Sequence, residues 1–186
     1  MAIRNIFINF ALLITKYRMK EATISNERLT QAAATGMDEF MQSVADAILE
    51  AVGGELNAET MPLLNSDQIT LLAYVMMREE VMDGGFVQLI HNGLGRFIFV
   101  NPFDKALALW GLTSLSRLVK KAHKFYNKYH KEIEVECTDE EFMAMFERMA
   151  EFDDLDDEFV ADEEQWTNMI ACYIDDNLDR FVTVVD

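Results

Sequence analysis

The segment from Glu132 to Asp186 combines a dense negative charge with regularly recurring aromatic residues. It contains 20 Asp or Glu and two Arg, which gives −18, whereas the whole chain has a net charge of −17. Disordered acidic segments are poor in aromatic residues. This segment instead contains seven of them: Phe142, Phe146, Phe152, Phe159, Trp166, Tyr173 and Phe181. We therefore expect it to fold, with its apolar side chains inward and its carboxylates outward.

The spacing of apolar residues predicts helices along the whole chain. Phe40, Val44 and Ile48, for example, recur every fourth residue, as one face of a helix does. Only two prolines interrupt the chain, and no alternating pattern typical of a strand is present. The sequence therefore predicts an all-α fold, a single compact multi-helix domain of residues 19–186 with roughly seven to nine helices.

Polar residues before the apolar stripes predict where individual helices begin. Ser25 is expected to cap a first helix, and Thr138 with Glu141 forms a capping box. Thr113 or Ser114 is expected to cap a long helix, whose outer face is basic, and Asp162 to cap the last helix. Residues 57–64 are expected to form a loop.

Residues 1–18 form an apolar segment flanked by basic residues, and its role is left open. The run from Ile6 to Ile14 imitates a signal peptide, but no small-residue cleavage site follows it. It is also too short to span a bilayer. We prefer a docked amphipathic helix, or translation that begins at Met19. With two cysteines that match no disulfide framework or zinc spacing, we expect a cytoplasmic protein that does not bind membranes.

Two glycine-containing motifs and one acidic motif connect the chain to a known family. Residues 79–88 read EEVMDGGFVQ, residues 91–95 read HNGLG, and residues 155–159 read LDDEF. These motifs resemble the bacterial DNA-mimic protein family, small acidic all-helical proteins with an E-V-x-N-G-G-F-x-Q segment. Asp83 stands where that segment usually has Asn. The resemblance implies an all-helical fold and a homodimer. For one member it also implies inhibition of a helix-turn-helix transcription regulator by imitation of DNA charge.

The motif residues themselves favour a structural role over a polar site around His91. Two adjacent glycines permit a junction between helices, Phe86 is expected to plug the core, and the amides of Gln88 and Asn92 are expected to bond to backbone groups. The residues assigned to this role are Glu80, Gly84, Gly85, Phe86, Gln88, Asn92, Leu155, Asp156 and Phe159.

Catalysis, metal binding and cofactors find little support in the sequence. No nucleophile elbow, phosphate-binding loop or dinucleotide-binding fingerprint is present, and His91, His123 and His130 are the only histidines. The acidic run from Asp153 to Glu158 lacks the alternate spacing and central glycine of a calcium loop. We therefore predict a non-catalytic protein with no metal and no cofactor.

The acidic residues of the last third of the chain are the candidate partner-binding surface. On a helix, carboxylates three or four positions apart imitate, at lower density, the phosphates of a duplex. The candidates are Asp139, Glu140, Glu147, Glu151, Asp153, Asp154, Asp157, Glu158, Asp162, Glu163 and Glu164. They predict a DNA mimic that occupies the DNA-binding surface of a basic DNA-binding protein or transcription regulator, and no direct binding of nucleic acid.

The alternative is a structural or protein-interaction module whose acidic surface serves solubility. Lysines of the preceding basic stretch are expected to neutralise part of that surface in this case. They are Lys120, Lys121, Lys124, Lys128 and Lys131.

Overall fold

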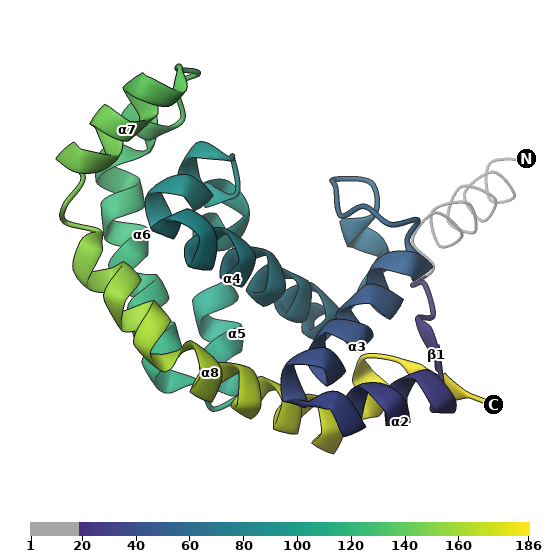
Figure 1. Ribbon diagram of the computed structural model, residues 1–186. Helices are drawn as coiled ribbons and strands as arrows, with labels where there is room; N and C mark the ends of the chain where they lie inside the picture. Colours follow the sequence, from purple (N-terminus) through teal and green to yellow (C-terminus); the bar gives the residue numbers. More distant parts are fainter. Residues whose placement is uncertain (1–18) are drawn as a thin grey trace, which may run out of the picture. The chain divides into compact units, whose positions relative to one another are not determined.

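A computed structural model describes residues 19–186, and the predictions for residues 1–18 lie outside this range. The described residues are mostly helical, so the predicted all-α class is confirmed (Figure 1). The α-helices are α2 (Asn26–Thr35), α3 (Met37–Ala51), α4 (Ser66–His91), α5 (Phe103–Leu109), α6 (Thr113–Ile133), α7 (Asp139–Arg148) and α8 (Asp153–Asp176). Two 3-10 turns (Met61–Leu63 and Leu178–Arg180), a π turn (Arg96–Val100) and strands β1 (Thr23–Ser25) and β2 (Thr183–Val185) complete the chain. No helix within residues 19–186 is long and apolar enough to cross a membrane.

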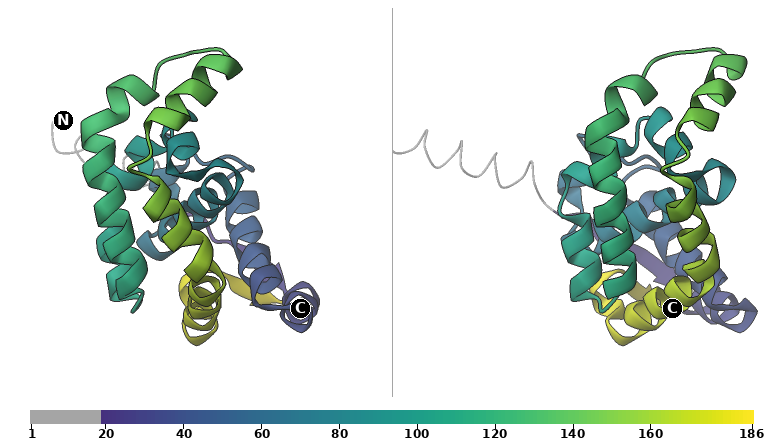
Figure 2. Two further views of the ribbon diagram at one scale, coloured as in Figure 1. Left: turned by 60° about the vertical axis from the view of Figure 1, so that its left-hand side comes forward. Right: turned by 90° about the vertical axis from the view of Figure 1, so that its left-hand side faces the viewer.

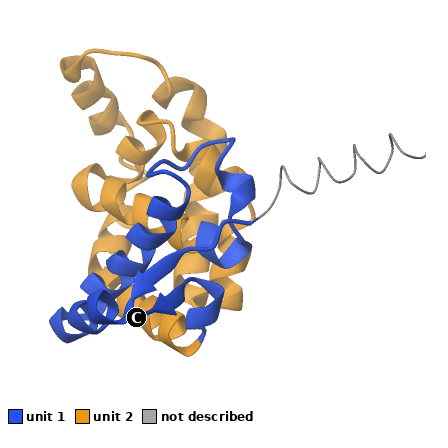
Figure 3. Cartoon of the chain, turned by 90° about the vertical axis from the view of Figure 1, so that its right-hand side faces the viewer, with its two compact units in different colours: residues 1–69, 177–186 blue, residues 70–176 orange. Residues whose placement is uncertain are grey.

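The chain divides into two compact units, which we describe separately (Figure 3). Of the described residues, unit 1 contains 19–69 and 177–186, and unit 2 contains 70–176. The prediction of a single domain over residues 19–186 stays a prediction.

Unit 1 joins the two ends of the described chain through a short parallel sheet. Strand β1 pairs with β2 in the register Thr23 to Thr183, and the N–H of Thr183 also donates to the carbonyl of Ala22. The sequence predicted no strand here, because three residues are too few to show an alternating pattern. β-Branched residues such as Ile24 and Val184 favour the extended conformation once the two ends meet.

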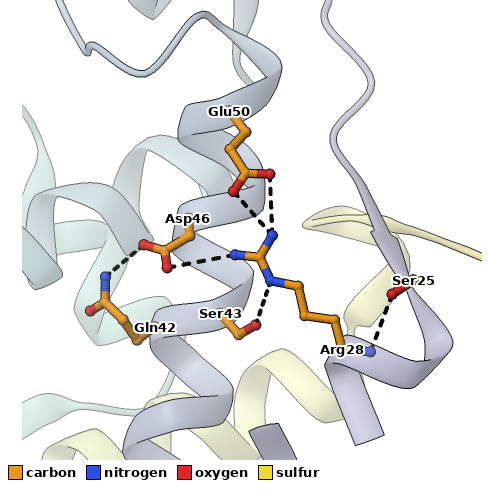
Figure 4. Close-up of polar contacts among 6 residues, drawn as sticks. All are labelled: Ser25, Arg28, Gln42, Ser43, Asp46 and Glu50. Carbon is orange, nitrogen blue, oxygen red and sulfur yellow. Dashed lines mark hydrogen bonds and ion pairs between the residues drawn. The ribbon is translucent and has the colours of Figure 1, made fainter. Parts of the chain in front are cut away.

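A polar clamp around Arg28 fastens α2 to α3 within unit 1 (Figure 4). The hydroxyl of Ser25 accepts from the backbone N–H of Arg28 at 3.2 Å, which confirms the predicted cap. The Arg28 guanidinium donates to Ser43 at 3.2 Å and to Glu50 at 3.0 Å, and lies 3.6 Å from Asp46. One planar group with several donors therefore fixes two helices at once.

Unit 2 contains the rest of α4 together with α5 to α8. Helices α6 and α8 contact each other, and both views of Figure 2 show them side by side. Helix α7 lies at the end of this pair where α6 ends and α8 begins. Phe86 and Phe159 meet edge to face at the centre, with ring centroids 6.2 Å apart, and both are fully buried.

Two local predictions about helix boundaries are wrong. Asp162 caps no helix, since α8 runs unbroken from Asp153 and contains neither glycine nor proline. Helix α6 begins without a side-chain cap, and the hydroxyl of Ser114 instead accepts from the Trp166 indole N–H at 2.9 Å. The loop predicted at residues 57–64 is present and contains a short 3-10 turn at Met61–Leu63. The Thr138–Glu141 capping box at the start of α7 is also confirmed.

Candidate functional site

Most of the acidic residues selected from the sequence lie on the surface of α7 and α8 in unit 2. Eight of them are exposed or half-buried and have no ion pair within residues 19–186. They are Asp139, Glu140, Glu147, Asp153, Asp154, Asp157, Asp162 and Glu164. We call these eight residues the acidic face.

Buried apolar residues support the acidic face from below. Met145 and Met149 are buried under α7, and Phe152, Leu155 and Phe159 are buried under the first turns of α8. Each helix begins with carboxylates in its first turn, where the positive end of the helix dipole stabilises negative charge. The backbone positions of these carboxylates are therefore fixed by packing in both helices and, in α7, also by the capping box.

Two further acidic residues from the predicted set are paired with lysines of α6. The Nζ of Lys121 lies 2.8 Å from Glu158, and that of Lys128 lies 3.0 Å from Glu151. A third lysine, Lys120, pairs with Asp104 instead, at 3.6 Å. Lysines of α6 thus neutralise two of the predicted carboxylates, and the acidic face keeps its charge.

Glu163 does not belong to the exposed set. Its side chain is only 11% exposed, and it forms an ion pair with Arg78 of α4. The hydroxyl of Thr167 donates to the same carboxylate at 2.7 Å and shares a hydrogen bond of 2.8 Å with the Tyr74 hydroxyl. A buried carboxylate needs such partners to offset its loss of hydration. Glu163 therefore links α4 to α8 and is not available on the surface.

Sequence reasoning missed this buried network, although the spacing contained a signal for it. Glu163 falls four residues after Phe159, three before Trp166 and seven before Ile170, all of which are buried. It therefore lies on the apolar stripe of α8 and not on its outer face. Arg78, by contrast, has no signal in the sequence that identifies it as the partner.

The two glycines of the motif break α4 into two helical parts. Gly84 has φ −155° and ψ 26°, and Gly85 has φ +73° and ψ −177°, neither of which is helical. A side chain at Gly85 would also overlap the carboxylate of Asp156, and one at Gly84 would overlap the Gln88 amide. The positive φ favours glycine at Gly85, and a side chain at either position would force the Asp156 or Gln88 side chain to move.

Asp156 of α8 accepts a hydrogen bond from the first residue after the break. The backbone N–H of Phe86 donates to its Oδ1 at 2.8 Å. Burial raises the pKa of Asp156 from 3.8 to about 6; the hydrogen bond from Phe86 opposes the rise, and the nearby Asp153 and Asp157 add to it. The carboxyl group thus serves as a cap for the second part of α4.

The amide side chains of Gln88 and Asn92 donate to carboxylates, whereas the sequence predicted that they bond to backbone groups. The Gln88 amide donates to Asp83 at 2.8 Å and to Glu80 at 3.2 Å. The Asn92 amide donates to the same Glu80 oxygen at 2.8 Å. The sequence prediction of backbone partners was wrong because the turn after Gly85 brings Gln88 over the preceding acidic residues.

His91, the histidine nearest the motif, is used to hold neighbouring elements. Its Nδ1–H donates to the carbonyl of Ile133 at the end of α6, at 2.8 Å. Its ring also packs against Phe142 of α7, with centroids 4.7 Å apart. His91 therefore links the end of α4 to α6 and α7.

Comparison with known proteins shows that most of the residues described above match a known family. Residues 62–177 match the family model described as DMP19-like protein. The matched residues include the glycine junction and all of α7 and α8.

A curated relative from Neisseria meningitidis serogroup B (strain ATCC BAA-335 / MC58) is named DNA mimic protein DMP19. It is 30% identical over 146 residues, which cover 78% of this chain and 88% of the relative. The similarity therefore extends over nearly the full length of that protein.

Proposed function

This chain belongs to the DMP19-like protein family, and we propose that it is itself a non-catalytic DNA mimic. In this proposal, the acidic face occupies the DNA-binding surface of a basic DNA-binding protein or transcription regulator. The observation that carries the proposal is the set of eight accessible carboxylates on α7 and α8 that have no ion pair within residues 19–186. The name of the N. meningitidis relative supports the same function.

The spacing of the acidic face suits a surface that normally holds phosphates. Carboxylates three or four residues apart on a helix lie about 5–6 Å from each other. B-DNA carries about one phosphate per 1.7 Å of axis over both strands, so the acidic face is a thinner version of that pattern. Because α7 is capped and both helices are packed on buried apolar residues, the backbone that carries the charges needs no ordering when a partner binds, which preserves affinity.

The finer expectations about partners follow from this proposal. The partner is a protein with a basic cleft for duplex DNA. The chain binds this partner in a stoichiometric complex. Complementary charge speeds such an encounter and makes it sensitive to salt. From the family resemblance, we also propose that the chain forms a homodimer. The free cysteines Cys137 and Cys172 are compatible with a cytoplasmic location.

The ion pairs of α6 with Glu158 on α8 and with Glu151 just before α8 favour a second function, in which the chain is a protein-interaction module with a solubilising acidic surface. Lys121 and Lys128 neutralise two carboxylates and so lower the negative charge of the surface, whereas a DNA mimic needs that charge. Under this alternative, no individual exposed carboxylate contributes to binding.

A competition experiment tests the proposal. The immobilised full-length chain is incubated with a soluble extract of its own cells, and retained DNA-binding proteins are identified. Each is then bound to its own DNA in a gel-shift assay, and the chain is added across a salt series. We expect stoichiometric release of DNA that weakens steeply as salt rises.

Matched variants separate the acidic face from net charge. One triple variant, Glu140→Gln/Glu147→Gln/Asp157→Asn, neutralises three of the eight carboxylates of the acidic face. The control, Glu39→Gln/Glu55→Gln/Glu59→Gln, neutralises three exposed acids of unit 1 and changes the net charge equally. We expect only the first to lose competition. Equal competition by both variants, or no DNA-binding protein retained at low salt, would rule the mimic out.

A further inference from the structure

The C-terminal half of α8 presents a groove with a different character from the acidic face. Its lining residues recur at intervals of three and four along α8, from Ala161 to Asp176, and therefore form one continuous face of the helix. Trp110, at the end of α5, closes one side of it. The Trp110 and Tyr173 rings stack there, with centroids 4.6 Å apart.

The middle of the groove is uncharged and partly apolar. Met169 is 38% exposed, and Ala161 and Cys172 are also exposed. The amides of Gln165 and Asn168 lie between them and have no hydrogen-bond partner within residues 19–186. An exposed methionine beside aromatic rings is an adaptable apolar contact surface. Because this stretch has no carboxylates, it does not resemble a row of phosphates.

Carboxylates mark the two ends of the groove. Glu164 lies near one end and Asp176 at the other, and neither has an ion pair within residues 19–186. They are twelve residues apart, which on a helix is about 18 Å. The lining contains no Lys or Arg. The groove therefore complements an apolar segment with a basic residue at each end.

We propose that this groove docks an amphipathic helix of a protein partner, with an apolar stripe between two Lys or Arg residues about three turns apart. A helix fits better than an extended strand, because the backbone groups of α8 are already bonded within the helix and offer no edge for pairing. Two helices packed at a shallow angle remain in contact over this length.

The charge of the groove disfavours a second copy of the chain as its occupant. Two such grooves packed together would bring Glu164 and Asp176 of one copy against the same carboxylates of the other, and like charges repel. The inference goes beyond the proposed DNA mimicry, since it concerns a partner helix and the uncharged part of α8, and only Glu164 belongs to both surfaces.

A labelled model peptide tests the groove on the full-length chain. The peptide is a helix of about 20 residues with Leu and Ala on one face and Lys residues about 12 positions apart. Its binding is measured by fluorescence anisotropy. A control peptide has the same composition with its Leu residues distributed around the helix. We expect the control to bind at least about tenfold more weakly, because it cannot place an apolar stripe in the groove.

Substitutions with matched controls locate the binding site. Met169→Lys places a charge in the centre of the groove, and Met143→Lys makes the same change at an exposed methionine of α7. We expect Met169→Lys to weaken binding about tenfold and Met143→Lys less than about twofold. Likewise, Glu164→Gln/Asp176→Asn is expected to weaken binding several times more than Asp153→Asn/Asp154→Asn. Circular dichroism checks that all four variants remain helical.

Three outcomes would overturn the inference. Equal binding of the two peptides, or equal effects of Met169→Lys and Met143→Lys, would show attraction by net charge alone. Conversion of a dimer to a monomer by Met169→Lys, measured by sedimentation, would show that a second copy occupies the groove. None of these measurements involves DNA or a DNA-binding protein, so they remain separate from the test of mimicry.

Discussion

The carboxylate of Asp156 on α8 accepts a 2.8 Å hydrogen bond from the backbone N–H of Phe86 on α4. The two residues are 70 positions apart in the chain, and the bond forms where Gly84 and Gly85 interrupt α4. Two segments of the family resemblance, the glycine motif and LDDEF, thus meet at one hydrogen bond. The acidic first turns of α8 are fixed to the core at this point.

The first prediction concerns this glycine junction. Gly85→Ala introduces a Cβ at φ +73° and into the space of the Asp156 carboxylate. We expect it to lower the free energy of unfolding by about 2–4 kcal/mol, measured by chemical denaturation, because strain and overlap add. Gly93→Ala is the control, since Gly93 has φ +85° with open space around it. It is expected to cost only about 1 kcal/mol, and equal losses would contradict the role of Asp156.

The second prediction is a pH dependence that arises from Asp156. Its pKa is about 6 in the folded protein and 3.8 as its ordinary value, so folding favours the protonated form. The contribution of protonated Asp156 to the free energy of unfolding is fully present below about pH 4, and it is lost as the pH rises through about 6. With about 1.4 kcal/mol per pKa unit, the loss is at most about 3 kcal/mol.

Asp156→Asn isolates this titration. We expect the free energy of unfolding of the wild type to fall relative to that of Asp156→Asn between pH 4 and pH 7. The exposed Asp154→Asn serves as the control, because Asp154 is in the same turn and does not contact Phe86. A wild-type curve that stays parallel to that of Asp156→Asn would show that Asp156 does not titrate in this range.

The third prediction distinguishes two adjacent glutamates of α8. Glu163→Gln weakens a buried ion pair with Arg78 and is expected to cost about 1.5–3 kcal/mol of unfolding free energy. Glu164→Gln, at an exposed position, is expected to change it by less than about 0.5 kcal/mol. Thermal unfolding followed by circular dichroism is sufficient for the comparison. If both variants have the same melting temperature, Glu163 is not a structural residue.

The fourth prediction links the α6 lysines to the proposed mimicry. Lys121→Ala/Lys128→Ala releases Glu158 and Glu151, so it adds two accessible carboxylates beside the acidic face. We expect tighter competition in the gel-shift assay and a loss of less than about 1 kcal/mol in stability per exposed pair.

The control for this prediction is Lys124→Ala/Lys131→Ala, which makes the same change in net charge at exposed lysines without an ion pair within residues 19–186. If both variants compete more tightly than the wild type to the same extent, the effect is due to net charge. No improvement by either would favour the solubility function.

Sequence patterns predicted the parts of this protein that depend on local interactions. Helical periodicity and the scarcity of proline determined the all-α class, and the hydrogen bonds of Ser25 and Thr138 were predictable because their partners lie three residues away. The cap assigned to Asp162 failed because an aspartate is also tolerated inside a long helix whose buried stripe continues.

What only the tertiary structure decided is which charges remain on the surface. By itself, the sequence determined the position of the −18 segment and the aromatic stripes beneath it. It did not reveal that Glu163 turns inward to Arg78, that Glu158 meets Lys121, or that Asp156 binds Phe86. Each of these partners is between 37 and 85 residues away in the chain. Composition sets total charge, but burial and distant partners set the charge that a neighbouring protein meets.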